Sequence, residues 1–296
     1  MPLIECVPNV SEGRRAEIIE RCAEAIRATP ARLLDVSSDP IHHRTVYTFV
    51  GEAAAVESAV HALFEAALPA IDLRQHTGVH PRLGAVDVVP FAPLTGATMA
   101  DCVSLARRVG EEVARRHELP VYLYEAAATR PERRRLEEIR RGGLGALAAR
   151  MEQDAWRPDF GPTAPHASAG VSVVGARPLL VAYNVTLRSR EVAVAKAIAA
   201  AIRQSSGGLP SVKAMGVDLP DRELVQVSMN LTDYERTSMA DVFDRIASEA
   251  ERLGVSVAGS EIVGLVPAAA LPPSAAERLK LEGNVEDRIL ERRLRA

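Results

Sequence analysis

The sequence predicts an α/β (α+β) protein with two ferredoxin-like subdomains, each with the element order β-α-β-β-α-β. Strand-type and helix-type runs alternate along the chain, and the same order of runs occurs twice. A length of 296 residues is typical of two domains. Each sheet needs its bare face covered, so we expect the sheets to face each other, with helices on the outer faces. We place the subdomains at 1–177 and 178–296.

The first half contains short runs rich in β-branched and apolar residues between two helix-type stripes. The clearer stripe places Val56, Val60, Leu63 and Phe64 on one helix face. Predicted strands are 3–10, 33–36, 45–50 and 85–91, and predicted helices are about 14–29 and 52–68. A helix at 99–117, a strand at 121–124 and a basic helix at 131–141 extend this half.

The second half repeats the pattern and then continues into a tail. Predicted strands are 179–187, 212–217, 224–231 and 255–266, and predicted helices are 190–202 and 239–253. In the tail, Ser274 followed by Glu277 has the spacing of a capping box. We expect a final amphipathic helix from about Asn284.

Composition restricts the partners of this chain. The net charge of -3 argues against nucleic acid or an anionic membrane surface as the main partner, which favours small molecules. The three cysteines are far apart, so neither a disulfide framework nor a zinc knuckle is indicated. The N-terminus lacks a signal-peptide pattern, and no apolar run reaches the roughly 18 residues of a membrane span. We therefore expect an unprocessed cytoplasmic protein.

Four polar loops next to predicted strands are the candidate sites of chemistry. They are 8–13, 39–45, 76–84, and 175–177 together with Tyr183 and Asn184. In the third loop, His76 and His80 have the spacing of a helical metal-binding pair. Gly78 and Pro81 oppose a helix there, so a loop that presents His80 is the better interpretation.

Histidine exchanges protons near neutral pH, so His80 is a candidate general acid and base. A loop histidine bonded to backbone is the structural alternative, and His76 is expected to be structural or to support His80. Arg44, Arg82 and Arg177 have the paired donors that clamp carboxylates, although each also suits a surface ion pair.

Other chemistries have weaker signals. A zinc or nickel site from His42, His43, His76 and His80 is the main rival, but the spacing of structural zinc sites is absent. No Gly-x-Ser-x-Gly elbow and no phosphate-binding glycine loop occurs. The basic helix at 130–141 is interpreted as a solvated face whose arginines pair with nearby glutamates.

Several blocks taken together resemble one family. The chain is similar to the glutamate formimidoyltransferase (formiminotransferase) family through almost its whole length, and it ends where a fused cyclodeaminase domain would begin. The blocks are Cys6-Val-Pro-Asn-Val-Ser-Glu-Gly13, Arg44-Thr-Val-Tyr-Thr-Phe-Val-Gly51, His80-Pro-Arg-Leu-Gly84, Pro120-Val-Tyr-Leu-Tyr124, Pro158-Asp-Phe-Gly-Pro162, Gly175-Ala-Arg177, Gln226-Val-Ser-Met-Asn230 and Gly264-Leu-Val-Pro267.

The resemblance implies transfer of a formimino group from N-formimino-L-glutamate to nitrogen 5 of tetrahydrofolate, a step of histidine degradation and one-carbon metabolism. Tetrahydrofolate would be a co-substrate, no metal would be needed, and the protein would be a homodimer. His80 matches the catalytic histidine. Residues expected to bind substrate or folate are Asn9, Arg44, Arg82, Gly84, Arg177 and Asn184. His42, His43 and His76 are expected to contact the residues that bind substrate, without contacting the substrate themselves.

Three positions depart from the family pattern, which commonly has Asn, Glu and Asn where this chain has His43, Val79 and Thr186. Losing an acid beside His80 should leave its protonated form less stabilised. The lost amides remove paired hydrogen-bonding groups. Alternatives therefore stay open: formyl transfer between 5-formyltetrahydrofolate and glutamate, transfer to a changed acceptor, or a non-catalytic folate-binding homologue. The histidine cluster separately leaves a metallohydrolase open.

Overall fold

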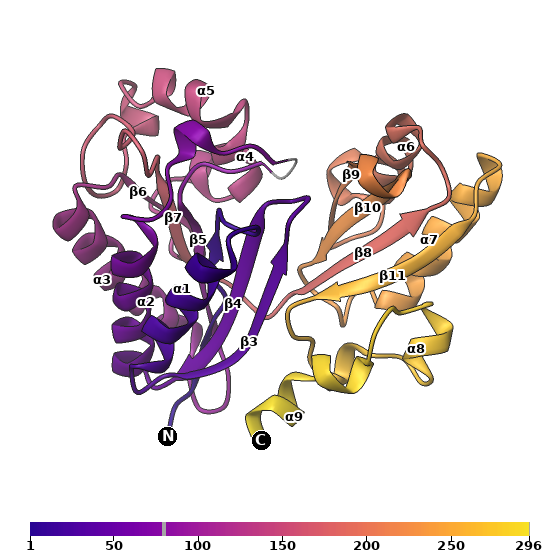
Figure 1. The fold of residues 1–296 in the computed structure, drawn as a ribbon, viewed down its shortest axis with the longest axis horizontal. Helices are drawn as coiled ribbons and strands as arrows, with labels where there is room; N and C mark the ends of the chain where they lie inside the picture. The colour runs from indigo at the N-terminus through magenta and orange to yellow at the C-terminus, as the bar shows by residue number, and fades with distance from the viewer. Residues whose placement is uncertain (79–80, 296) are drawn as a thin grey trace. The chain divides into compact units, whose positions relative to one another are not determined.

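The computed structural model describes residues 1–78 and 81–295. The chain forms two compact units, Met1–Pro178 and Leu179–Ala296. Each unit has its own β-sheet with packed helices (Figure 1), so the predicted α/β class with two sheets is confirmed. The predicted facing of the two sheets stays a prediction.

A seven-stranded mixed sheet forms the centre of the first unit, with the order β3-β4-β1/β2-β5-β7-β6. Its strands β5, β7 and β6 run parallel, and the other pairs are antiparallel. The strands are β1 (Ile4–Cys6), β2 (Asn9–Val10), β3 (Arg32–Asp39), β4 (Arg44–Gly51), β5 (Val86–Pro93), β6 (Val121–Glu125) and β7 (Ser172–Ala176). The predicted single strand at 3–10 is wrong: it is divided at Val7 and Pro8, where proline has no N–H to donate to a ladder.

Strands β5, β6 and β7 of the first sheet are covered on both faces. One face packs on α1 (Ala16–Arg27), α2 (Ala53–Ala67) and α3 (Met99–His117), through residues such as Val89 and Leu123. Their sequence neighbours Val88 and Tyr122 point to a separate core with α4 (Leu136–Arg140) and α5 (Gly143–Arg150). This alternation is the period-two pattern of a sheet that is buried on both sides.

Two sequence expectations about this extension are wrong. The basic segment is not one helix, because the 3-10 turn Pro131–Arg133 ends before α4 begins. It is also not simply a solvated face, since Arg133 is buried and forms an ion pair with Asp159 at 3.0 Å. In addition, β7 was not predicted. Its run Ser-Val-Val-Gly-Ala is too short to signal a strand before its parallel partners β5 and β6 are known.

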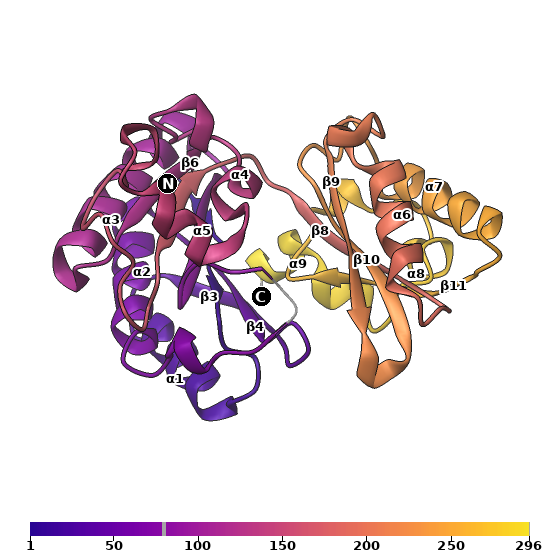
Figure 2. The ribbon, with the colours of Figure 1, turned by 90° about the horizontal axis from the view of Figure 1, so that it is seen from above.

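A four-stranded antiparallel sheet with the order β11-β8-β10-β9 forms the centre of the second unit. This fourth-first-third-second order is also that of β5, β1/β2, β4 and β3 in the first unit. The elements are β8 (Val181–Leu187), α6 (Val192–Ile202), β9 (Val212–Leu219), β10 (Leu224–Leu231), α7 (Met239–Arg252) and β11 (Val257–Val263). Helices α6 and α7 lie on the same side of the sheet (Figure 2) and pack on its apolar face.

The tail consists of short elements: the 3-10 turn Ala268–Ala270, α8 (Ala275–Arg278), the 3-10 turn Val285–Arg288 and α9 (Leu290–Arg295). The capping box predicted at Ser274 is wrong, because Ser274 has a φ of 52° and its side chain makes no cap hydrogen bond. Complete capping boxes occur instead at Thr98 with Asp101, before α3, and at Ser238 with Asp241, before α7.

Candidate functional site

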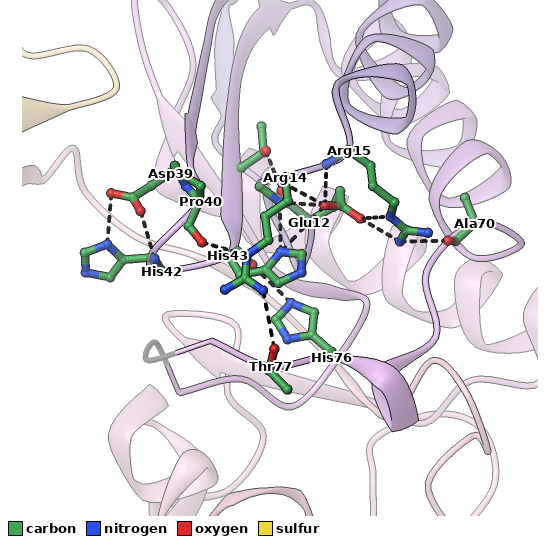
Figure 3. A network of polar contacts seen from close by, with 12 residues as sticks. Glu12, Arg14, Arg15, Asp39, Pro40, His42, His43, Ala70, His76 and Thr77 are labelled. Carbon is green, nitrogen blue, oxygen red and sulfur yellow. Dashed lines mark hydrogen bonds and ion pairs between the residues drawn. The ribbon is translucent and has the colours of Figure 1, made fainter. Parts of the chain in front are cut away.

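Three loops of the first unit meet at one end of its sheet. They are the β2–α1 loop, the β3–β4 turn and the α2–β5 loop (Figure 3). Two glycines allow this close approach. A Cβ at Gly13 would lie 2.3 Å from the carbonyl oxygen of Asp39, and a Cβ at Gly78 would lie 2.9 Å from that of His42. Any side chain at these positions would push the loops apart.

Glu12 organises the start of α1. Its Oε1 accepts hydrogen bonds from the backbone N–H groups of Gly13, Arg14 and Arg15 at 3.0, 2.8 and 3.0 Å, and its Oε2 accepts from Arg15 Nε at 2.6 Å. Burial by itself would raise the pKa of this carboxyl group, but the hydrogen bonds from Arg15 and Arg14 outweigh it and lower the pKa. Glu12 is therefore a buried anion that fixes the loop.

His43 joins this loop to the β3–β4 turn. Its Nδ1 accepts a hydrogen bond from the backbone N–H of Gly13 at 3.1 Å, so the neutral ring carries its proton on Nε2. Burial, reinforced by Arg14, Arg82 and Arg15, lowers the pKa of His43 despite the carboxylate of Glu12. The backbone of His43 has a φ of 50°, a left-handed conformation that histidine tolerates better than most side chains.

His76 connects the third loop to the other two. Its ring stacks on that of His43, with 3.9 Å between centroids. A carbonyl oxygen only accepts, so Nε2 of His76 donates to the carbonyl oxygen of His43 at 3.1 Å, which leaves Nδ1 to accept from Arg82 Nη1. Arg82 Nη2 also donates to the carbonyl oxygen of Gly78 at 3.0 Å. His76 thus orients the guanidinium of Arg82.

Asp39 and His42 hold the β3–β4 turn on its other side. Asp39 Oδ1 accepts from the backbone N–H of His42 at 2.8 Å, and Oδ2 lies 3.0 Å from His42 Nδ1. Burial would raise the pKa of Asp39, but the hydrogen bonds from His42 dominate and lower it to about 2. Figure 3 shows the side chains of His42 and His43 on different sides of the turn, and the ring of His43 stacks on that of His76.

A cluster of arginines surrounds Asp87. Asn9 pairs with Val88 and Val10 with Val86, so Asp87 is the extra residue of a β-bulge, a feature that re-aims a side chain. Its Oδ1 accepts from the backbone N–H groups of Leu83 and Gly84 at 2.6 and 3.1 Å, and its Oδ2 accepts from Arg140 Nη2 at 2.5 Å.

Positive charge exceeds negative charge in this cluster. Burial, and then the charge of Arg140, lowers the pKa of Arg44 to about 10, although Asp87 and Asp39 oppose the shift. Burial likewise lowers the pKa of Arg82, on which Arg14 and Arg140 also act. A cluster of guanidinium groups with this excess of positive charge suits a carboxylate, which each guanidinium can bind with two parallel hydrogen bonds.

The other predicted site residues of the first unit have separate settings. His80 and Val79 lie outside the described residues. Asn9 Nδ2 donates to the carbonyl oxygen of Val7 at 3.1 Å. A Cβ at Gly84 would lie 2.2 Å from the carbonyl oxygen of Val171, so this glycine permits close backbone packing.

Arg177 lies away from the arginine cluster around Asp87. Its backbone N–H bonds to the carbonyl oxygen of Phe91, which is about 13 Å along β5 from Asp87 at the usual strand rise. Its side chain contacts the buried hydroxyl of Tyr124. Burial raises the pKa of Tyr124 to about 12, although Arg177 opposes the shift.

The structure gives the proposed metal site no support among the residues that it describes. Within 1–78 and 81–295, no group of three histidine, cysteine, aspartate or glutamate side chains is arranged to hold a metal ion. Nδ1 of His43 and both ring nitrogens of His76 take part in the loop network instead. No helix in the described parts of the chain is long and apolar enough to span a membrane.

Asn184 belongs to a polar network in the second unit. Asn184 Nδ2 and Gln226 Nε2 both donate to Oε1 of Glu261, each at 3.0 Å. Gln226 Nε2 also lies 3.3 Å from Oγ1 of Thr186. All four side chains lie on the sheet face opposite α6 and α7, because they alternate with core residues such as Val185 and Val227.

Comparison with known sequences decides the family. The N-terminal subdomain of the formiminotransferase domain matches residues 3–177, and the formiminotransferase domain matches residues 182–286. The chain belongs to the formiminotransferase family. The recognition made from the sequence blocks is therefore confirmed.

Two relatives in this family match along nearly their full length. Glutamate formimidoyltransferase of Streptococcus pyogenes serotype M1 is 41% identical, over 99% of this chain and 98% of its own. The protein of the same name from Thermoplasma acidophilum is 44% identical over the same shares. Formimidoyltransferase-cyclodeaminase of Mus musculus is 44% identical over 93% of this chain but only 52% of its own length, consistent with a match to the transferase part alone. A solved structure of an unknown protein from Galdieria sulphuraria covers 90% of this chain and 99% of its own at 8% identity, and its TM-score of 0.28 is too low to indicate a shared fold.

Sequence reasoning missed five residues of these networks: Glu12, Asp87, Arg140, Gln226 and Glu261. One signal was available for Asp87, which is the single acid in the apolar run Ala85–Phe91. A charge inside a predicted buried strand needs a partner, so it should have indicated a buried cation. Arg140 had no comparable signal among its neighbouring arginines.

Proposed function

We propose that this protein transfers a formimino group from N-formimino-L-glutamate to nitrogen 5 of tetrahydrofolate. The observation that carries the proposal is the full-length similarity to two proteins named glutamate formimidoyltransferase. The arginine cluster supports it, because the amino-acid donor and the glutamyl tail of folate both carry carboxylates. Tetrahydrofolate is the co-substrate in this proposal.

His80 is the proposed proton shuttle. Nitrogen 5 of tetrahydrofolate attacks the formimino carbon, and His80 takes the proton that this nitrogen loses. The tetrahedral intermediate then collapses, the bond between the carbon and the glutamate nitrogen breaks, and His80 returns the proton to that nitrogen. The proton balance closes without another reactant, and glutamate leaves as a neutral amine at the reacting nitrogen.

Arg44, Arg82 and Arg140 are the proposed carboxylate-binding groups. After burial, the charge of Arg140 contributes to the lowered pKa of both Arg44 and Arg82, and one ligand carboxylate would offset part of the positive charge of this cluster. His76 orients Arg82, so its proposed role is positioning. Holding both substrates in one geometry would supply much of the remaining rate acceleration. Roles for Asn9, Gly84, Arg177 and Asn184 in substrate or folate binding stay part of this proposal.

The direct test is turnover by the purified full chain. Wild-type protein is expected to form 5-formiminotetrahydrofolate from N-formimino-L-glutamate and tetrahydrofolate, and His80→Ala should reduce kcat by roughly 10²- to 10⁴-fold. His166→Ala is the matched control and should retain activity. If only 5-formyltetrahydrofolate and glutamate react, formyl transfer replaces formimino transfer. Folate binding without turnover of either pair would identify a non-catalytic homologue.

We also propose that the enzyme is a cytoplasmic homodimer. The three cysteines are buried thiols, which suits a reducing compartment.

Light scattering of the purified chain tests the proposed dimer and should give twice the mass of 31.8 kDa. A mass of one chain at micromolar concentration would exclude the dimer.

A further inference from the structure

A series of contacts joins the start of α1 to the guanidinium of Arg82. The backbone N–H of Gly13 donates to Nδ1 of His43, and the ring of His43 stacks on that of His76 with an angle of 28° between the ring planes. Nδ1 of His76 then accepts from Arg82 Nη1. Three loops of the first unit are therefore linked through two imidazole rings, which are labelled in Figure 3.

His43 offers His76 a fixed surface. The side chain of His43 is 12% exposed, and its Nδ1 is held by the N–H of Gly13. Its left-handed backbone, with a φ of 50°, accompanies a carbonyl oxygen that accepts from Nε2 of His76 at 3.1 Å. His43 thus contacts His76 with both its ring face and its backbone.

The stack restricts rotation of the His76 ring. The torsion about the bond between Cβ and the ring has broad, roughly two-fold minima, so an imidazole can make a half-turn. That half-turn would exchange Nδ1 with a ring carbon, and Arg82 would lose its acceptor. A second ring 3.9 Å away on one face obstructs the upright orientation through which the half-turn must pass.

Gly78 brings His43 and Arg82 close together. A Cβ at Gly78 would lie 2.8 Å from Cβ of His43 and 2.8 Å from Nη2 of Arg82. Nη2 also donates to the carbonyl oxygen of Gly78 at 3.0 Å. The two side chains therefore pack around one backbone position, and a smaller side chain at position 43 would leave space beside the guanidinium.

We propose that His43 is a positioning residue for Arg82 and acts through the ring of His76. This role rests on the proposed function, in which Arg82 binds a substrate carboxylate. A guanidinium that is already held in one orientation loses little freedom when the carboxylate binds, so more of the contact energy contributes to affinity. Without the stack, the same guanidinium must be ordered during binding.

His43→Asn tests the positioning directly, because it removes the ring and keeps the loop. Asparagine adopts the left-handed backbone readily, and its amide oxygen can still accept from the N–H of Gly13. In nitrogen relaxation measured by NMR on the ligand-free full chain, the Nε–H group of Arg82 should be more mobile in this variant than in wild type. Arg82→Gln assigns the signal by its loss. Unchanged mobility of Arg82 would overturn the proposal, whether or not the protein is active.

Steady-state kinetics test the consequence for substrate binding. His43→Asn should raise the KM for N-formimino-L-glutamate by roughly three- to tenfold with little change in kcat, the effect expected when one side chain is no longer held in place before binding. In an Arg82→Gln background, the same substitution should change KM by less than about twofold. Equal increases in both backgrounds would mean that His43 does not act through Arg82.

His117→Asn is the matched control. His117 of α3 stacks on Phe64 of α2 with 6.0 Å between centroids, so this variant also removes an imidazole from a ring stack. It should leave the mobility of Arg82 and the KM unchanged, with melting temperature measured for each variant. A KM increase equal to that of His43→Asn would contradict the proposal. Absence of turnover in wild-type protein contradicts the proposed function, whereas the NMR comparison still decides whether His43 positions Arg82.

Discussion

The two units share a strand order but use their polar residues differently. In the first unit, charged side chains gather where loops meet at the end of a sheet, and Asp87 is shared by two backbone N–H groups and Arg140. In the second unit, the network lies on the sheet face opposite α6 and α7, and two side-chain amides donate to the carboxylate of Glu261. The comparison teaches that one strand order can carry either charged side chains on loops at a sheet end or an amide–carboxylate network on a sheet face.

The largest expected effect tests whether charge stabilises the first unit more than the second. Asp87→Asn should lower the free energy of unfolding by about 3 kcal/mol, because it leaves Arg140 in a half-buried site without its carboxylate. Urea denaturation measures the loss. Glu57→Gln, which breaks a surface pair with Arg108, should cost less than about 1 kcal/mol.

Glu261→Gln in the second unit should also cost less than about 1 kcal/mol, because the glutamine carbonyl still accepts both amide donors. If Asp87→Asn and Glu261→Gln lowered the free energy of unfolding equally, charge would not stabilise the first unit more than the second.

The next largest effect tests whether the arginine cluster around Asp87 binds substrate. Arg44→Gln should raise the KM for N-formimino-L-glutamate by roughly tenfold with a smaller change in kcat, because a carboxylate contact is lost in both ground and transition states. Steady-state kinetics at two salt concentrations measure it, and the wild-type KM should rise with salt. Arg203→Gln, at a partly exposed position in the second unit, should have no effect on this KM. An unchanged KM in Arg44→Gln would remove Arg44 from the site.

Acid should weaken the first unit through Asp39. The pKa of Asp39 is about 2 in the folded chain and 3.8 without its partners, so the ionised group stabilises the fold above about pH 4. That stability is lost as pH falls through the window from about 4 to 2. Because Asp39 is partly exposed, we expect about 1 kcal/mol after allowing for solvent screening. Asp39→Asn should lose less stability than wild type over this window in urea denaturation, and an identical pH profile would contradict the assignment.

The smallest effect tests a feature common to both units. Thr98→Ala before α3 and Ser238→Ala before α7 each remove a capping box with the same geometry. Each should lower the melting temperature by roughly 2 to 4 °C, because one backbone N–H loses its side-chain acceptor. Calorimetry of the two variants measures it. Ser274→Ala, where no cap bond forms, should leave the melting temperature unchanged.

The sequence by itself determined most of the local structure and the family. Helix α3 was predicted with its observed bounds, and so was strand β10, because apolar periodicity and capping signals act within a few residues. The family followed from blocks of residues in a fixed order. The broken basic segment at 131–141 and the missed strand β7 mark the limit of this reasoning, since both depend on packing partners far along the chain.

Only the tertiary structure decided which charged groups act together. Arg140 and Asp87 are 53 residues apart in sequence, and a β-bulge and a short helix bring them into contact. The stack of His43 on His76 likewise needs two glycines that let separate loops approach. Local patterns specify the direction of a side chain within its element, whereas an ion pair or a ring stack depends on how elements pack. The same reason explains why Asn184 was singled out from the sequence while its partner Glu261 was not.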